Sequence, residues 1–146
     1  MKLSWWPTVA GTALAAFIAL DTSLERDANM ASMVVWFDIP VSDMDRAIRF
    51  YEALTGQTLT RLPVGPGEET ALFDPGEKGE VSGCLFLSPD DKPSVYGSRV
   101  NLNANPSIDV WSARVEPAGG KIAVGRGVFA YIIDSEGNRV GLHAMA

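Results

Sequence analysis

Three side chains of this sequence are candidates for acid–base chemistry. His143 is the only histidine in the 146-residue chain, and Asp38 and Glu69 are carboxylates within predicted strands. A general base has to lie within hydrogen-bond reach of the proton that it removes, and spacing along a sequence does not establish such reach. The chain has no Ser–His–Asp spacing, no phosphate-binding glycine loop and no Cys-x-x-Cys pair. The sequence therefore assigns no catalytic residue and leaves these three side chains as candidates.

A second group of side chains is better suited to binding than to catalysis. Arg99, Asn101 and Asn103 alternate with apolar residues, so we expect them on one face of a strand. Arginine offers a planar fork of donors for a carboxylate or carbonyl oxygen, and aromatic side chains can line an apolar pocket. The predicted ligand-binding residues are Trp36, Asp38, Arg99, Asn101, Asn103, Tyr131 and His143.

These side chains are positioned by a strand–helix pattern that occurs twice. Residues 34–39 alternate as a strand that Pro40 ends, and they put Trp36 and Asp38 on one face. Ser42 is predicted to cap the following helix, with Asp45 in the capping-box position.

The core stripe of that helix is predicted to be Ile48, Tyr51 and Leu54. A second strand and helix repeat the pattern, and their helix start at Ser107 lies about 65 residues after the first. The further predictions are strands at 58–62, 69–73 and 81–87, then a strand at 98–104, a helix at 107–118 that Pro117 shortens, and strands at 121–125, 127–133 and 139–144. A repeat of this length predicts two copies of one supersecondary unit.

Three short motifs occur in an order that is typical of one superfamily. They are Asp43-x-x-Arg46-x-x-x-Phe50-Tyr51, then Gly119-Gly120-Lys121, then Asp134-Ser-Glu-Gly137-Asn-Arg-Val140. Together they resemble the vicinal oxygen chelate superfamily, which contains glyoxalase I, bleomycin-resistance proteins and extradiol dioxygenases. The resemblance implies an α+β fold in which two βαβββ modules form a curved mixed sheet, or cup.

The resemblance also implies the domain organisation. A single domain is expected at 31–146, with module one at 33–88 and module two at 97–145. An apolar leader or added helix at 1–30 precedes this domain. Many small glyoxalase-like proteins that open on a similar Trp-Phe-x-Ile-Pro strand have no assigned activity.

The positions of metal ligands follow from the same resemblance. Metal-using members place one ligand on the first and last strand of each module, and these positions fall at Trp36, Gly83, Arg99 and Gly141. Indole and glycine offer no ligand atom, and arginine is a permanent cation that repels a metal ion. We therefore expect no metal and no cofactor, and without the ion the metal-dependent glyoxalase and dioxygenase mechanisms lose their Lewis acid.

Composition and charge restrict the partners. The formal net charge of −6 argues against nucleic acid, because no basic face is apparent to neutralise phosphates. Cys84 is the only cysteine, which excludes an intrachain disulfide, and its apolar surroundings indicate an inert core thiol. We expect a cytoplasmic protein, or an exported one if the leader is a true signal.

The first thirty residues have the outline of a secretory signal. Lys2 precedes an apolar run from Val9 to Leu20, and a polar stretch follows. The expected small-x-small cleavage site is poor, because Ala19-Leu20-Asp21 does not supply one, and the run is too short for a comfortable membrane span. The alternatives are an uncleaved leader, an upstream extension before a start at Met30 or Met33, and an added helix. We favour a helix that packs on an apolar surface.

Three functions compete at this point. The first is a metal-free cup that sequesters or senses a small organic ligand, as bleomycin-resistance relatives bind a drug without altering it. The second is a metal-independent isomerase or lyase that uses His143 or a carboxylate as base. The third is an interaction or structural protein whose leader fills the cup or an interface. We favour the first, and we expect a homodimer because one chain leaves strand edges and the cup exposed.

Deletion of residues 1–29 tests the predicted leader helix. Residues from about Pro7 to Leu20 favour a helix that is marginal as an isolated peptide, so its order has to come from burial of Leu14, Phe17 and Ile18. Each such side chain contributes roughly 1.5–3 kcal/mol when fully buried. We expect the deletion to lower the melting temperature or to change the oligomeric state in sedimentation. A truncated chain that matches full length in both measurements contradicts this prediction.

Overall fold

The computed structural model describes residues 33–77 and 80–145, and the chain from Val34 onward forms one compact unit. Its first half contains β1 (Trp36–Val41), α2 (Met44–Thr55), β2 (Thr60–Gly65), β3 (Glu68–Leu72) and β4 (Ser82–Leu87). Its second half contains β5 (Asn101–Asn103), α3 (Ile108–Val115), β6 (Lys121–Arg126), β7 (Phe129–Ile133) and β8 (Arg139–His143).

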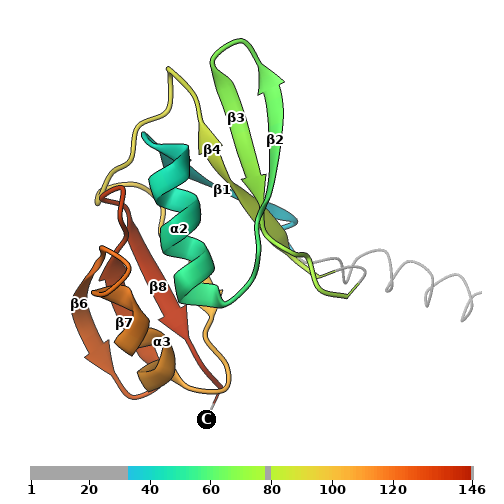
Figure 1. Ribbon diagram of the computed structural model, residues 1–146. Coiled ribbons are helices and arrows are strands. Elements are labelled where there is room, and N and C mark those ends of the chain that lie inside the picture. The colour runs from blue at the N-terminus through green and yellow to red at the C-terminus, as the bar shows by residue number, and fades with distance from the viewer. Residues whose placement is uncertain (1–32, 78–79, 146) are drawn as a thin grey trace, which may run out of the picture. The chain divides into compact units, whose positions relative to one another are not determined.

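The two halves fold into the same kind of mixed sheet (Figure 1). The first sheet has the strand order β1-β4-β3-β2, and the second has the order β5-β8-β7-β6. In each sheet the first and last strands of the half pair in parallel, and the remaining pairs are antiparallel. The predicted α+β fold of two βαβββ modules is confirmed, with each module forming its own four-stranded sheet.

The first strand of each module differs from its predicted extent. β1 continues through Pro40 to Val41, so the prediction that Pro40 ends the strand was wrong. β1 is an edge strand, where the missing N–H of a proline costs no ladder hydrogen bond. β5 is shorter than the predicted 98–104, because the chain pairs with β8 in a regular ladder only at Asn101–Asn103.

The N-cap of α2 is Asp43 and not the predicted Ser42. Asp43 is extended, with φ −138° and ψ 104°, and its carboxylate accepts a hydrogen bond from the Arg46 amide at 2.9 Å. Asp45 is consequently out of the capping-box position, and its carboxylate pairs with Arg61 instead. Serine and aspartate are both good caps, and the choice is decided by Glu136, which takes the Ser42 hydroxyl.

The buried face of α2 is wider than the predicted stripe. Tyr51 and Leu54 are fully buried as predicted, whereas Ile48 is only partly buried. Met44, Ala47 and Phe50 complete the buried face. The face is wide because α2 contacts α3 in addition to β3 and β4 of its own sheet.

The Gly119-Gly120 motif brings the two modules together. A Cβ atom on Gly120 would lie 2.7 Å from Phe50 Cε2 and 2.7 Å from the Ile133 carbonyl oxygen, so this position has no room for a side chain. Gly119 has a φ of 101°, a conformation that glycine adopts without strain. The motif therefore follows the end of α3 and also makes room for the aromatic core of the first module.

Glu136, in the turn between β7 and β8, binds the N-terminus of α2. Its carboxylate accepts hydrogen bonds from the backbone amides of Ser42 and Asp43, each at 3.0 Å, and from the Ser42 hydroxyl at 2.9 Å. Arg46 adds two hydrogen bonds, at 2.7 and 2.9 Å. Burial alone raises the pKa of Glu136, but the hydrogen bonds from Arg46, Ser42 and Asp43 outweigh it and lower the pKa to about 2.

A buried polar cluster continues this connection between the modules. The Tyr51 hydroxyl donates to Asp134 Oδ2 at 2.6 Å, and Asp134 Oδ1 accepts from the amides of Glu136 and Asn138. Asn138 Nδ2 donates to the Pro40 carbonyl oxygen at 2.8 Å. Burial and the neighbouring Asp134 carboxylate raise the pKa of Tyr51 well above its usual value, so the phenol stays neutral and donates.

The predicted leader at 1–30 and its helix lie outside the residues that the structure describes. Within residues 33–77 and 80–145, none of the helices is both long and apolar enough to cross a membrane.

Replacing Glu136 by glutamine is expected to destabilise the fold at pH 7 by roughly 2–3 kcal/mol, a typical value for hydrogen bonds to a charged group. The pKa of this carboxyl is lowered from 4.5 to about 2 in the folded protein. Its stabilisation is therefore complete above about pH 4.5 and is lost as the pH falls toward 2. Urea denaturation should show the wild-type advantage over Glu136→Gln shrinking across this range.

The matched control for this experiment is Glu77→Gln, which changes an exposed glutamate. This variant should stay close to wild type in its free energy of unfolding at every pH. An unchanged difference between wild type and Glu136→Gln from pH 7 to pH 2.5 would contradict the role given to Glu136.

Candidate ligand-binding site

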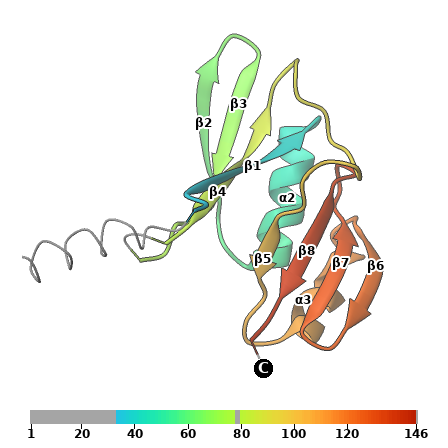
Figure 2. The ribbon, with the colours of Figure 1, turned by 180° about the vertical axis from the view of Figure 1, so that it is seen from behind.

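Each sheet has one face that packs on a helix and one face that no described helix covers. Figure 2 shows α2 behind β1, and α3 behind β7 and β8. We call the uncovered faces the outer faces. According to the strand register, the outer face of the first sheet carries Trp36, Asp38, Cys84 and Phe86. The outer face of the second sheet carries Asn101, Asn103, Phe129, Tyr131, Arg139, Gly141 and His143.

On the first outer face, Trp36 and Cys84 both donate to Asp38. Trp36 Nε1 lies 2.9 Å and Cys84 Sγ lies 3.0 Å from Asp38 Oδ1. Burial, reinforced by the hydrogen bond to the Asp38 carboxylate, raises the pKa of the Cys84 thiol to about 12. The Cys84 side chain is buried, and its chemical inertness stays a prediction. Asp38 is held by two neighbours on its own sheet.

On the second outer face, cationic and aromatic side chains pack on one another. Arg99 Cζ lies 4.1 Å from the centroid of the Tyr131 ring, within the range of a cation–π contact. The rings of Phe129 and His143 have centroids 4.4 Å apart and planes inclined by 33°. The structure thus brings the predicted residues Arg99, Tyr131 and His143 to the same face as Asn101 and Asn103.

Asn101 takes the space beside Gly141. These two residues are register partners, and a Cβ atom on Gly141 would lie 1.9 Å from Asn101 Oδ1. Any larger side chain at Gly141 would have to displace the asparagine amide. The position of the Asn101 side chain on this face therefore requires glycine at residue 141.

Two predicted positions lie on the helix-covered side of the first sheet. Glu69 shares a face with Leu87 and forms an ion pair with Arg61, which in turn pairs with Asp45 of α2. Gly83 is the register partner of Phe37, and a Cβ atom there would meet the Phe37 carbonyl oxygen at 2.2 Å. The residue of β4 that accompanies Asp38 on the outer face is Cys84.

A groove of about 800 Å³ runs between the two modules, beside β5. One wall carries the predicted residues Arg99, Asn101 and Asn103. The first module contributes the apolar side chains of Val34, Phe37, Phe73 and Val81, and also the acidic side chains of Asp74 and Glu80. The volume of the groove lies within the range of about 300–1,000 Å³ that is usual for small-molecule sites.

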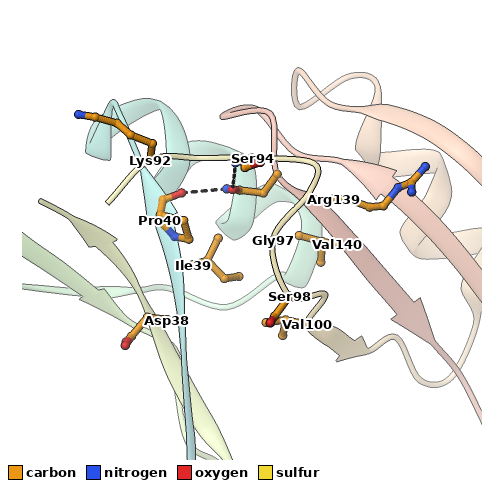
Figure 3. A pocket seen from close by; sticks show the side chains of 11 residues that line it. Asp38, Ile39, Pro40, Lys92, Ser94, Gly97, Ser98, Val100, Arg139 and Val140 are labelled. Atoms are coloured by element: carbon orange, nitrogen blue, oxygen red, sulfur yellow. Dashed lines mark hydrogen bonds between the residues drawn. The ribbon is translucent and has the colours of Figure 1, made fainter. Parts of the chain in front are cut away.

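A smaller cavity of about 160 Å³ adjoins this groove at Ser98 and Val100, which line both. Figure 3 shows the segment between β4 and β5 passing over it, with Ile39, Val100 and Val140 around its interior. Asp38 lies at its edge. Trp36, Tyr131 and His143 line neither of these two cavities, so the predicted residues occupy a wider surface than either cavity alone.

The groove also contains side chains that the sequence pattern assigned to the core. Phe37 and Phe73 pack on each other with centroids 5.8 Å apart, yet both also line the groove. Strand alternation predicts the helix-covered face for Phe37 correctly. It contains no signal that this face remains open where the two sheets meet.

The described donors do not form a metal centre. Among residues 33–77 and 80–145, no three His, Cys, Asp or Glu side chains gather closely enough to share an ion. Asp38 and Cys84 meet at 3.0 Å, and the other group in contact with Asp38 Oδ1 is the Trp36 indole N–H, which offers no ligand atom. On the second sheet, Arg99 and Gly141 are the predicted ligand positions, and the Asn101 side chain takes the space beside Gly141.

Solved structures with the same fold include proteins of several activities. A trypanothione-dependent glyoxalase I from Leishmania major has 16% identity and a TM-score of 0.62, with 77% of this chain and 86% of that chain covered. An antibiotic-binding protein from a Streptomyces species has 22% identity and a TM-score of 0.57, covering 80% and 98%. A fosfomycin resistance protein from Listeria monocytogenes has 14% identity and a TM-score of 0.58, covering 80% and 94%.

At these identities the likeness concerns the fold alone. No curated protein matches the sequence. The family model of the Glyoxalase/Bleomycin resistance protein/Dioxygenase superfamily matches residues 33–140, from before β1 to the start of β8. The chain therefore belongs to the Glyoxalase/Bleomycin resistance protein/Dioxygenase superfamily.

Proposed function

We propose that this protein binds a small organic molecule in the groove between its modules and on the adjoining outer faces, without a metal ion. The observation that carries the proposal is the composition of the groove, in which apolar side chains of the first module, among them Phe37 and Phe73, lie together with Arg99, Asn101 and Asn103. Apolar surface with a few polar groups is the usual composition of a small-molecule site. The antibiotic-binding relative with this fold is consistent with sequestration.

Acid–base catalysis has less support than binding. The His143 ring packs on Phe129, and no described carboxylate forms an ion pair with it. Asp38 is held by Trp36 and Cys84, and Glu69 lies on the other face of its sheet. An effective base is usually oriented by a third group, and no described carboxylate orients His143, while Asp38 Oδ1 already accepts two hydrogen bonds.

We also propose a cytoplasmic homodimer. The outer faces expose large apolar side chains, among them Trp36, which is 46% exposed, and Phe129, which is 44% exposed. Exposed apolar patches on a small domain mark interaction surfaces. Two of the four edge strands, β2 and β6, contain register shifts, and such bulges discourage edge-to-edge pairing. Contact through the faces is therefore better supported than contact through these two edges.

The proposal predicts that ligand binding does not depend on a metal ion. Thermal melts with a panel of small aromatic and aliphatic compounds should identify ligands that raise the melting temperature. A ligand at a concentration 100 times its Kd adds about 2.7 kcal/mol to the free energy of unfolding. The shift should be the same after EDTA treatment as with added zinc or nickel. Near-stoichiometric metal in the purified protein, or a ligand shift that requires the ion, contradicts this proposal.

The raised pKa of Cys84 predicts slow alkylation in the folded state. At pH 8 the thiolate fraction is very small because burial and the Asp38 carboxylate hold the pKa at about 12. Mass spectrometry should find little iodoacetamide adduct on the native chain and complete reaction in guanidinium, and the single cysteine makes the readout unambiguous. Rapid, complete labelling of the folded protein would instead identify Cys84 as a reactive thiol.

A further inference from the structure

We propose that the outer face of the second sheet recognises a planar aromatic carboxylate, with Arg99 as its charge partner. This inference rests on the proposed binding function and adds the chemical class of the ligand. It depends on three observations: the sign of the charge on this face, the packing of Arg99, and the aromatic surface beside it.

The outer face of the second sheet is cationic in a protein that is acidic as a whole. Strand register places Arg139 and Lys121 on the face of Ile133, and Arg99 joins them through its contact with Tyr131. The described strand positions of this face contain no Asp or Glu. The chain as a whole carries a net charge of −6 and would repel an anion. The cations gathered on this face make it a favourable place for an anion to bind.

Arg99 is held in place without a carboxylate. Its guanidinium packs 4.1 Å from the Tyr131 ring centroid, and no described acid forms an ion pair with it. A guanidinium that stacks on a ring keeps N–H donors at its edge, in a fork that matches a carboxylate. Because Arg99 also lines the groove, those donors are accessible to a bound molecule.

The surface beside Arg99 suits a flat aromatic body. Tyr131 and Phe129 alternate along β7, opposite Gly141 and His143 of β8. Phe129 is 44% exposed and packs on the His143 ring. Aromatic rings stack well on such a surface, in offset or tilted arrangements.

The asparagines supply neutral hydrogen bonds next to the cation. Asn103 Oδ1 accepts from the Asn105 amide at 3.1 Å, which leaves the Asn103 NH₂ group as a donor. Asn101 is exposed beside Gly141 and also lines the groove. Amide donors next to a guanidinium complete a site for carboxylate oxygens.

Carboxylates on the other side of the groove fix the orientation of the ligand. Asp74 and Glu80, from the connection between β3 and β4, also line the groove, and Asp38 lies on the first outer face. These groups repel an anion from the first module. The carboxylate of the ligand is therefore directed to Arg99, with the apolar body against the rings or the apolar wall.

Three probes of one shape test the charge requirement: 2-naphthoate, neutral 2-naphthamide and cationic 2-naphthylmethylamine. Titration of the full chain, followed by tryptophan fluorescence and by amide NMR shifts of Asn101, Asn103 and Tyr131, should give 2-naphthoate the highest affinity, about 10-fold above the amide. Arg99→Gln should remove this preference and leave the affinity for 2-naphthamide nearly unchanged. Added salt should weaken 2-naphthoate binding selectively.

The matched control is Arg49→Gln, which removes an exposed arginine on α2 and should leave every affinity unchanged. Arg99→Lys keeps the positive charge but loses the forked donors, so its preference for 2-naphthoate should lie between those of wild type and Arg99→Gln. This variant also tests the inference if Arg99→Gln is unstable. Equal binding of acid and amide, or preference for the amine, overturns the inference while the proposed function stands. If these probes do not bind but unrelated neutral compounds in the panel do, the inference of an aromatic carboxylate fails and the proposed binding function stands. If no compound binds, the inference and the proposed function both fail.

Discussion

The hydrogen bonds between Glu136 and the N-terminus of α2 are the constraint on which the arrangement of the two modules depends. One buried carboxylate accepts from two backbone amides, a hydroxyl and the Arg46 guanidinium. It satisfies helix donors that otherwise lack an intrahelical partner, at the end of the helix dipole that favours negative charge. Because this glutamate belongs to the second module and the helix to the first, the same interaction caps a helix and sets the position of one sheet relative to the other.

Other contacts between the two modules depend on the same relative position of the sheets. Tyr51 reaches Asp134, and Phe50 occupies the space that Gly120 leaves open. No strand ladder joins the two sheets among the described residues, so the modules are joined by side-chain contacts and packed helices. The groove and the small cavity lie where the sheets approach without pairing, and side chains of both modules line them.

The chain has the fold of the superfamily, and polar groups of its outer faces are engaged with their own neighbours. Asp38 accepts hydrogen bonds from Trp36 and Cys84, and Asn101 fills the space beside Gly141. The second sheet carries arginine, amide and aromatic groups. Such groups hold a ligand by directional hydrogen bonds and stacking, which is why binding has more support here than catalysis.

The sequence by itself determined the two-module fold and the outward face of Trp36, Asp38, Asn101 and Asn103, because hydrophobic periodicity and turn residues are local signals. It did not determine the face of Glu69 or Gly83, since a shift of one residue in register exchanges the faces of a strand. Ser42 and Asp43 are equally good caps locally, and only the approach of Glu136 from the other module decided between them. The groove likewise exists only in the tertiary structure, because the gap between two unpaired sheets depends on contacts that are distant in sequence.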